Sequence, residues 1–241
     1  MTADGIDPDV AGALTSLPVA RLVHFTPARN LSNILRDHAI RSVTEMQADA
    51  RAAFAPTDLQ RLDGHPDKIS CSLQYPNAFY LDIARGKASA ANYRDWVFLL
   101  LDKQVAATAG ALFCSRNAAA GGSVPGPDGL LGCYAGQTVG KGGQEYSRGP
   151  SHDPGSPTDV QAEVLVPAPV PLSSVYAIVF PSVEAAAEEE GRLERLSAPV
   201  PDAMRWIVSP GMFHKWTVAN AVRRSAYFAE TDWTRGTSAA G

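Results

Sequence analysis

The run Trp96–Leu101 restricts the fold most, because its six consecutive apolar residues leave no polar face for water. Such a run is consistent with a strand buried on both faces. Other segments with strand character are Ala20–Phe25, Lys68–Leu73, Ala162–Val166 and Val175–Phe180. Helical patterns lie between them, and the chain shows no internal repeat and no linker, so we predict a single α+β domain.

The helical patterns set the expected organisation of the chain. Leu31, Ile34 and Leu35 mark one face of a helix over Ala28–His38, and Pro27 suits its first turn. Ala78–Ala84 fits a short helix or a strand, and Ala185–Arg195 an exposed acidic helix. We expect a flexible arm over residues 1–18, a folded domain over 19–200 with a long loop at 110–156, and a helical extension packed against it over 201–241.

Composition narrows the class of protein. Of the 241 residues, 45% are hydrophobic, which supports a folded core. No long apolar run and no signal segment is found, so we expect a cytoplasmic protein. The three cysteines, Cys71, Cys114 and Cys133, form no CxxC pair, which favours neither a disulfide framework nor a zinc site.

Charge gives a mixed indication about partners. The net charge of −4 does not favour global nucleic-acid binding. The last fifth of the chain is nevertheless basic, with Arg205, Lys215, Arg223 and Arg224. This allows either a local basic face or ordinary solvated helix surfaces.

Two polar signatures interrupt the apolar strands. Glu163 stands at the head of the strand Ala162–Val166, where a long segment rich in Gly, Ser and Pro enters a packed sheet. His24 and Thr26 lie two residues apart on a strand, so their side chains project from the same face. Loops on rigid scaffolds often carry binding chemistry. Taken alone, these residues also fit a surface glutamate and a hydrogen-bonded core histidine.

Five segments in this order resemble the DarT family, bacterial toxins that use NAD to ADP-ribosylate bases in DNA. They are VHFTPARNLSNIL, RLDGHPDKISCSLQYPNAFYL, DWVFLL, LFCSRNAAA and RGPSHDPGSPTDVQAEVLV. The resemblance implies the ADP-ribosyltransferase fold for residues 19–200. In that fold, a split, mostly antiparallel β core is flanked by helices and NAD binds between the two half-sheets.

The resemblance also implies roles for individual residues. Glu163 falls on the catalytic glutamate, and Arg61 on an arginine implicated in catalysis and phosphate contact, with Arg51 as the lesser candidate. His24 and Thr26 match an H-x-T element that holds nicotinamide and its ribose. The cofactor-binding set is completed by Asn30, Ser70, Ser72, Asn77 and Tyr80. Gln161 matches a position that helps to choose the acceptor, and no metal is implied.

The 110–156 loop is the expected substrate-facing segment. It offers charged, amide and aromatic groups that an unpaired nucleotide can use for phosphate contact and stacking, namely Arg116, Asn117, Tyr146 and Arg148. Because a base attacked at its edge must be unpaired, single-stranded DNA is the natural substrate form. A flexible surface loop with incidental charges is the alternative.

The resulting hypothesis is a mono-ADP-ribosyltransferase that modifies a base in single-stranded DNA, as the toxin of a toxin–antitoxin pair with a macrodomain antitoxin. One alternative is an enzyme of the same fold with a protein or RNA acceptor, or one that hydrolyses NAD. The other is a catalytically inactive module that binds nucleotide or DNA. RLDGHPDKISCS departs from the thymidine-modifying branch, so the acceptor base does not follow from the resemblance.

Overall fold

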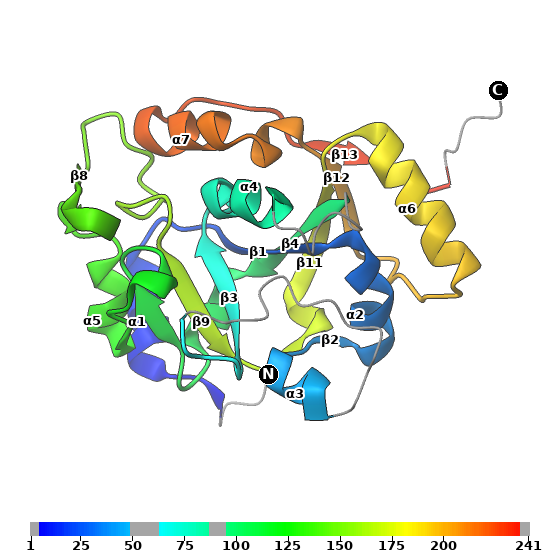
Figure 1. The fold of residues 1–241 in the computed structure, drawn as a ribbon, viewed down its shortest axis with the longest axis horizontal. Helices are drawn as coiled ribbons and strands as arrows, with labels where there is room; N and C mark the ends of the chain where they lie inside the picture. Colours follow the sequence, from blue (N-terminus) through cyan, green and yellow to red (C-terminus); the bar gives the residue numbers. More distant parts are fainter. Residues whose placement is uncertain (1–4, 49–62, 87–94, 237–241) are drawn as a thin grey trace.

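A nine-stranded sheet forms the centre of the molecule, with the strand order β13-β12-β11-β4-β1-β3-β9-β5-β6 (Figure 1). The computed structural model describes residues 5–48, 63–86 and 95–236. Among the described residues, neighbouring strands of this sheet are antiparallel except β11 and β12, which are parallel. Its strands are β1 (Arg21–Pro27), β3 (Lys68–Leu73), β4 (Trp96–Asp102), β5 (Leu112–Cys114), β6 (Val124–Pro125), β9 (Glu163–Pro167), β11 (Val175–Phe180), β12 (Arg205–Val208) and β13 (Thr231–Trp233).

Helices cover both faces of the sheet, and two small antiparallel pairs lie outside it. The pairs are β2 (Ala39–Ile40) with β10 (Val170–Pro171), and β7 (Gln137–Val139) with β8 (Glu145–Ser147). The α-helices are α1 (Pro8–Ser16), α2 (Leu31–Asp37), α3 (Val43–Ala48), α4 (Ala78–Gly86), α5 (Gly126–Gly132), α6 (Val183–Arg195) and α7 (Lys215–Arg224). The 3₁₀ turns are η2 (Ala28–Asn30), η4 (Lys103–Ala107), η5 (Ala118–Ala120), η6 (Lys141–Gly143), η7 (Leu172–Ser174) and η8 (Pro210–Phe213).

Strand β4 is buried on both faces, as its apolar run predicts. Phe98 and Leu100 face a cluster that includes Phe213 of η8, and the ring centroids of Phe98 and Phe213 lie 4.2 Å apart. Leu99 and Leu101 face the opposite cluster, to which α1, α2, α5 and α6 contribute apolar residues. The α+β fold with a mainly antiparallel sheet is therefore confirmed.

The sheet splits between β1 and β3. These two strands are paired only at Leu22 with Leu73 and Val23 with Ser72, whereas β1 stays paired with β4 along its whole length. From His24 onward, β1 is therefore no longer paired with β3 along the edge that faces it. This opening is the split expected from the family resemblance.

The N-terminal segment differs from the flexible arm predicted over residues 1–18. Residues 8–16 form helix α1, whose first turn is capped because Asp7 Oδ1 accepts hydrogen bonds from Asp9 N and Val10 N. Val10 and Leu14 are buried in the main core. The short, Pro-containing sequence did not predict this helix. Packing, more than intrinsic propensity, stabilises a helix of this length.

The predicted 110–156 loop and helical C-terminal extension are also more structured than expected. Residues 112–114 form β5, which joins the main sheet beside β9, and 126–132 form α5. The extension contains helix α7, but residues 205–208 form strand β12, paired in parallel with β11. Both strands are short, so neither gives a clear period in the sequence.

The helices and cysteines of the described residues bear on the class of protein. None of their helices combines the length and apolar character needed to cross a membrane. Cys71, Cys114 and Cys133 are all buried and free.

The packing of α1 leads to a stability prediction. Leu14→Ala should lower the free energy of unfolding by about 2–5 kcal/mol, because Leu14 is 0% exposed and its removal leaves a cavity. Denaturant unfolding followed by circular dichroism measures this change. Leu131→Ala on α5, where the side chain is 43% exposed, is the matched control and should cost about 1 kcal/mol or less. Equal, small losses for the two variants would restore the flexible-arm interpretation.

Candidate active site

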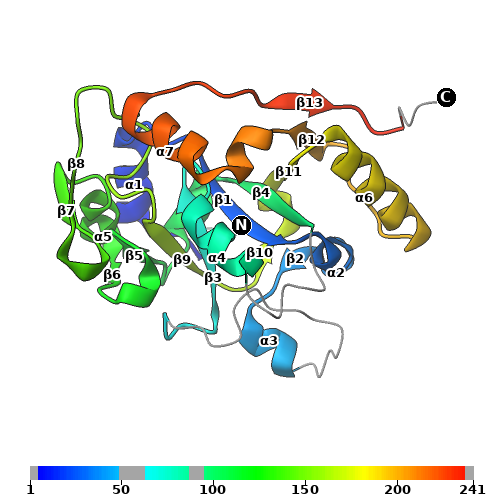
Figure 2. The ribbon, with the colours of Figure 1, turned by 45° about the horizontal axis from the view of Figure 1, so that its top comes forward.

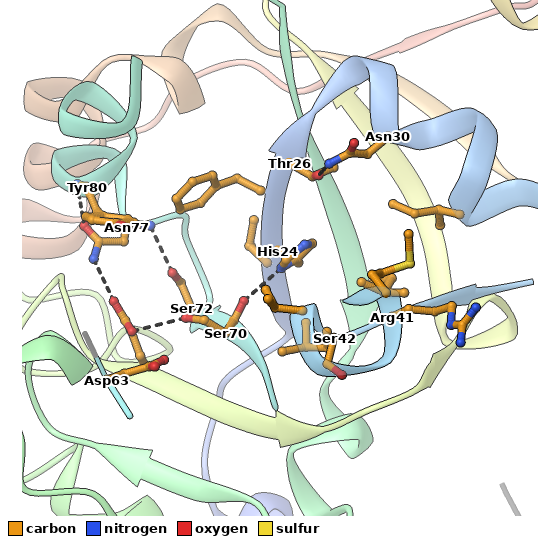
Figure 3. A pocket seen from close by; sticks show the side chains of 18 of the residues that line it. His24, Thr26, Asn30, Arg41, Ser42, Asp63, Ser70, Ser72, Asn77 and Tyr80 are labelled. Carbon is orange, nitrogen blue, oxygen red and sulfur yellow. Dashed lines mark hydrogen bonds between the residues drawn. The ribbon is translucent and has the colours of Figure 1, made fainter. Parts of the chain in front are cut away.

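A cavity of about 390 Å³ lies at the split in the sheet (Figure 3). Its walls come from β1, α2, β2, α3, β3, α4 and the head of β9. Eight residues that the sequence proposed for the site around NAD line it: His24, Thr26, Asn30, Ser70, Ser72, Asn77, Tyr80 and Glu163. Segments far apart in the sequence therefore meet at this opening.

Both faces of strand β1 contribute to the cavity wall. Val23, His24, Phe25 and Thr26 all line the cavity, although consecutive side chains of a strand point to opposite faces. This is possible because the cavity lies along the edge of β1 where pairing with β3 has ended. The split thus exposes the alternating H-x-T pair and its apolar neighbours together.

Glu163 is the buried carboxylate of the cavity, with only 7% of its surface exposed. One carboxylate oxygen, Oε1, accepts hydrogen bonds from Asn77 Nδ2 at 3.2 Å and Asn117 Nδ2 at 3.1 Å. The other, Oε2, accepts one from Ser70 Oγ at 3.1 Å. These three donors hold the carboxylate in one orientation.

The two asparagines hold Glu163 and start a helix at the same time. Asn77 Oδ1 accepts from Tyr80 N at 3.0 Å at the start of α4, and Asn117 Oδ1 accepts from Ala119 N at 3.1 Å at the start of η5. An asparagine at such a cap uses its oxygen for a backbone N–H. Its amide nitrogen is then directed elsewhere, and in both cases it donates to the same oxygen of Glu163.

The environment of Glu163 alters its acidity. Burial raises the pKa of its carboxyl from 4.5 to about 7, and the hydrogen bonds from Ser70 and Asn77 offset part of this effect. The nearby negative charge of Asp63, another residue of the cavity wall, adds a smaller increase to the pKa. A carboxyl with a pKa near neutrality can act as a general base under physiological conditions.

The H-x-T element lies across the split from Glu163. His24 Nδ1 is 2.9 Å from the carbonyl oxygen of Ser70, so the ring bridges β1 and β3 where their backbones have separated. Because a carbonyl oxygen only accepts, Nδ1 carries the proton in this contact. Thr26 Oγ1 accepts a hydrogen bond from Asn30 Nδ2 at 2.9 Å, which fixes the buried threonine (Figure 3).

The far side of the cavity is lined by residues that were not predicted from the sequence. Arg41 and Ser42 line it at the start of α3, and Arg41 is the only Lys or Arg among the described lining residues. Ser42 and Glu45 form a capping box, in which Ser42 N donates to Glu45 Oε2 at 2.8 Å and Glu45 N to Ser42 Oγ at 3.3 Å. This S-x-x-E pattern is readable in the sequence and predicts the helix start.

The residues expected to bind the acceptor are divided by the structure. Gln161 and Asn117 line the cavity, whereas Arg116, Tyr146 and Arg148 lie outside it. The guanidinium of Arg148 donates hydrogen bonds to the carbonyl oxygens of Ser156 and Asp153, at 2.6 and 3.1 Å. These bonds stabilise the turn before β9. Arg61 and Arg51, the candidates for phosphate contact, lie outside the described residues.

The described part of the chain contains no cluster of three or more His, Cys, Asp or Glu side chains able to hold a metal ion. The described cavity wall carries three carboxyl groups, those of Asp37, Asp63 and Glu163, and the guanidinium of Arg41, whose Nη1 lies 3.9 Å from Asp37 Oδ2.

The pKa of Glu163 predicts how stability depends on pH. The folded-state value, about 7, exceeds the ordinary 4.5, so folding favours the protonated form. Its contribution to stability is complete below pH 4.5 and is lost as the pH rises through 7. Glu163→Gln cannot ionise, so its stability relative to wild type should increase by about 2.5 kcal/mol as the pH rises from 5 to 8.

Urea unfolding at these two pH values measures the difference. Glu188→Gln, on the exposed side of α6, removes the same charge at the surface and is the matched control. Parallel pH profiles for Glu163→Gln and wild type would show that the carboxyl has an ordinary pKa.

Comparisons with known proteins identify the family of the chain. The family model described as "ssDNA thymidine ADP-ribosyltransferase, DarT" matches residues 23–213. None of the curated proteins compared with the chain matches it.

Solved structures share the fold at low sequence identity. Thermus sp. 2.9 DarT in complex with ADP-ribosylated ssDNA has a TM-score of 0.55 and 14% identity, over 82% of this chain and 98% of that one. Thermosipho africanus DarTG in complex with ADP-ribose has a TM-score of 0.51 and 14% identity, over 80% of this chain and 51% of that one. The family match spans well over half of the residues of this chain. The chain therefore belongs to the DarT family of NAD-dependent ADP-ribosyltransferases.

Proposed function

We propose that this protein transfers ADP-ribose from NAD to a base in single-stranded DNA, with Glu163 as the catalytic residue. The observation that carries the proposal is the buried Glu163 carboxylate, held by three side-chain donors in a cavity at the split of the sheet. A second support is the membership of a family described as acting on ssDNA.

The cavity has the volume of a ligand site and offers polar groups that suit NAD. Its volume of about 390 Å³ lies within the range of about 300–1,000 Å³ usual for ligand sites. Hydroxyl, amide and imidazole groups are placed between apolar side chains, as a ligand with a planar amide and two riboses requires. We assign His24 and Thr26 to the nicotinamide end, as the H-x-T resemblance implies.

The phosphates of NAD require positive charge. The resemblance assigns this role to Arg61, with Arg51 as the alternative, and we retain that assignment as a proposal. Arg41 is a further candidate because it is the one guanidinium among the described lining residues. A guanidinium can bind phosphate oxygens in a bidentate manner.

Cleavage of the bond between nicotinamide and ribose develops positive charge on the sugar. The Glu163 carboxylate can stabilise this charge and accept a hydrogen bond from a ribose hydroxyl, most effectively in a site with little water. It can then take the proton of the attacking base. Both roles need the ionised form, so turnover should rise with pH through about 7.

The acceptor side of the reaction lies at Gln161 and Asn117. Gln161 precedes Glu163 by two residues and lines the same cavity, so it is placed to contact the base that approaches the carboxylate. We therefore propose that Gln161 helps to choose the acceptor and that Asn117 positions Glu163.

Transfer of label tests the proposal directly. Wild type, Glu163→Gln and the surface control Glu188→Gln are incubated with labelled NAD and a panel of single-stranded DNA, single-stranded RNA and protein. Wild type and Glu188→Gln should label the DNA. Glu163→Gln should be slower by about 100-fold or more, since a preorganised charge is lost at the reacting centre.

Each other outcome favours a different alternative. Label on RNA or protein would exclude the DNA acceptor while keeping the enzyme class. Nicotinamide release without label transfer would indicate hydrolysis of NAD. Equal labelling by Glu163→Gln and wild type would remove Glu163 from the mechanism, and an absence of NAD consumption would favour a binding module.

We further propose that the protein is the toxin of a toxin–antitoxin pair, opposed by a macrodomain protein in the cytoplasm. Support comes from the family resemblance and from the DarTG relative solved with ADP-ribose. Induced expression in a bacterial host should stop growth, whereas Glu163→Gln expressed at the same level should not. Co-expression of a DarT-type macrodomain should restore growth with wild type. Growth arrest by Glu163→Gln would separate toxicity from catalysis.

A further inference from the structure

Helix α7 is a basic element beyond the family match, which ends at residue 213. The stretch from residue 203 to 229 contains four basic residues and no acidic residue, although the whole chain has a net charge of −4. Two of the four are engaged in ion pairs, Arg205 with Asp232 and Lys215 with Asp82. The other two, Arg223 and Arg224, are exposed at the C-terminal end of α7.

The buried face of α7 is joined to the segment that leads into Glu163. Val218 and Val222 pack in one cluster with Val160, which is three residues before the glutamate. Asp153 N donates to the carbonyl oxygen of Val222 at 2.8 Å, and Ser225 Oγ donates to that of Ser151 at 3.0 Å. Figure 2 shows α7 next to α4, whose Ala78 belongs to the same cluster. The exposed end of α7 is thus fixed relative to the acceptor side of the cavity.

Arg223 extends from α7 to the β7–β8 hairpin. Its guanidinium carbon lies 5.8 Å from the centroid of the Tyr146 ring on β8. On the neighbouring strand of the same hairpin, the carbonyl oxygen of Val139 accepts a hydrogen bond from Arg116 Nη1 at 3.2 Å. Arg116, Tyr146 and Arg223, which we call the acceptor-side band, are therefore connected through one hairpin.

The acceptor-side band is adjacent to the proposed catalytic residue. Arg116 directly precedes Asn117, whose amide donates to Glu163. Burial raises the pKa of Asp159, four residues before Glu163, while Arg223 and Arg116 both act to lower it. Both cations therefore act electrostatically on Asp159, which lies two residues before Gln161.

We propose that the acceptor-side band binds the stretch of single-stranded DNA next to the modified base, with Arg223 and Arg116 on phosphates and Tyr146 stacked on a base. This inference rests on the proposed function. Surfaces that bind single strands combine positive charge along the backbone with aromatic rings for the bases. Arg148 cannot contribute in the same way, because backbone carbonyl oxygens occupy its guanidinium.

Fluorescence anisotropy with a short labelled single-stranded oligonucleotide, without NAD and at several salt concentrations, tests this role. Arg223→Gln should weaken binding about threefold to tenfold and should reduce the slope of log K against log salt by about 0.7, the value for one lost phosphate contact. Tyr146→Leu should weaken binding about tenfold and leave the slope unchanged. Arg205→Gln removes the same charge on β12, away from the site, and should bind like wild type.

The outcomes separate this inference from the proposed function. If Arg223→Gln and Tyr146→Leu bind like Arg205→Gln while wild type labels DNA, the band is not used and the proposed function stands. If wild type neither binds nor labels single-stranded DNA, both fail. If thermal melting shows that one variant is unfolded, the other decides, because Arg223 lies on a helix and Tyr146 on a hairpin.

Discussion

The hydrogen bonding of one buried carboxylate links the parts of this structure. Glu163 of β9 receives amide hydrogen bonds from Asn77 and Asn117, and each asparagine also caps the start of a helical segment. Because a buried charge is costly unless donors surround it, the carboxylate and the two helix starts stabilise each other's positions. The same burial brings the pKa of Glu163 to about 7, which suits the general-base role proposed for it.

The split between β1 and β3 gives this carboxylate its cavity. A continuous ladder would have hidden the strand edge and placed His24 and Glu163 on opposite faces, since Leu22 pairs with Leu73 and Val23 with Ser72. Once pairing ends, side chains from both faces of β1 reach one opening. The imidazole of His24 bonds across the gap to the Ser70 carbonyl and so offsets part of the lost backbone pairing.

The two ends of the cavity differ in how far apart in the sequence their residues lie. The end assigned to nicotinamide consists of local elements, with β1 running through η2 into α2 in a single stretch. The end proposed for the acceptor combines η5 and the head of β9 with, outside the cavity, the β7–β8 hairpin and α7. The acceptor end therefore depends on tertiary packing, and α7 adds to it beyond the family match.

Local patterns in the sequence were enough to locate β3, β4, β9 and β11, because strand alternation and continuous apolar runs follow directly from burial. The resemblance supplied the family and the split sheet, both confirmed, and it singled out Glu163 and His24, whose roles remain proposals. The tertiary structure alone decided that α1 is packed, that residues 205–208 join the sheet, and that Asn77 and Asn117 meet at Glu163. These features depend on contacts between residues far apart in the sequence, and no local period records them.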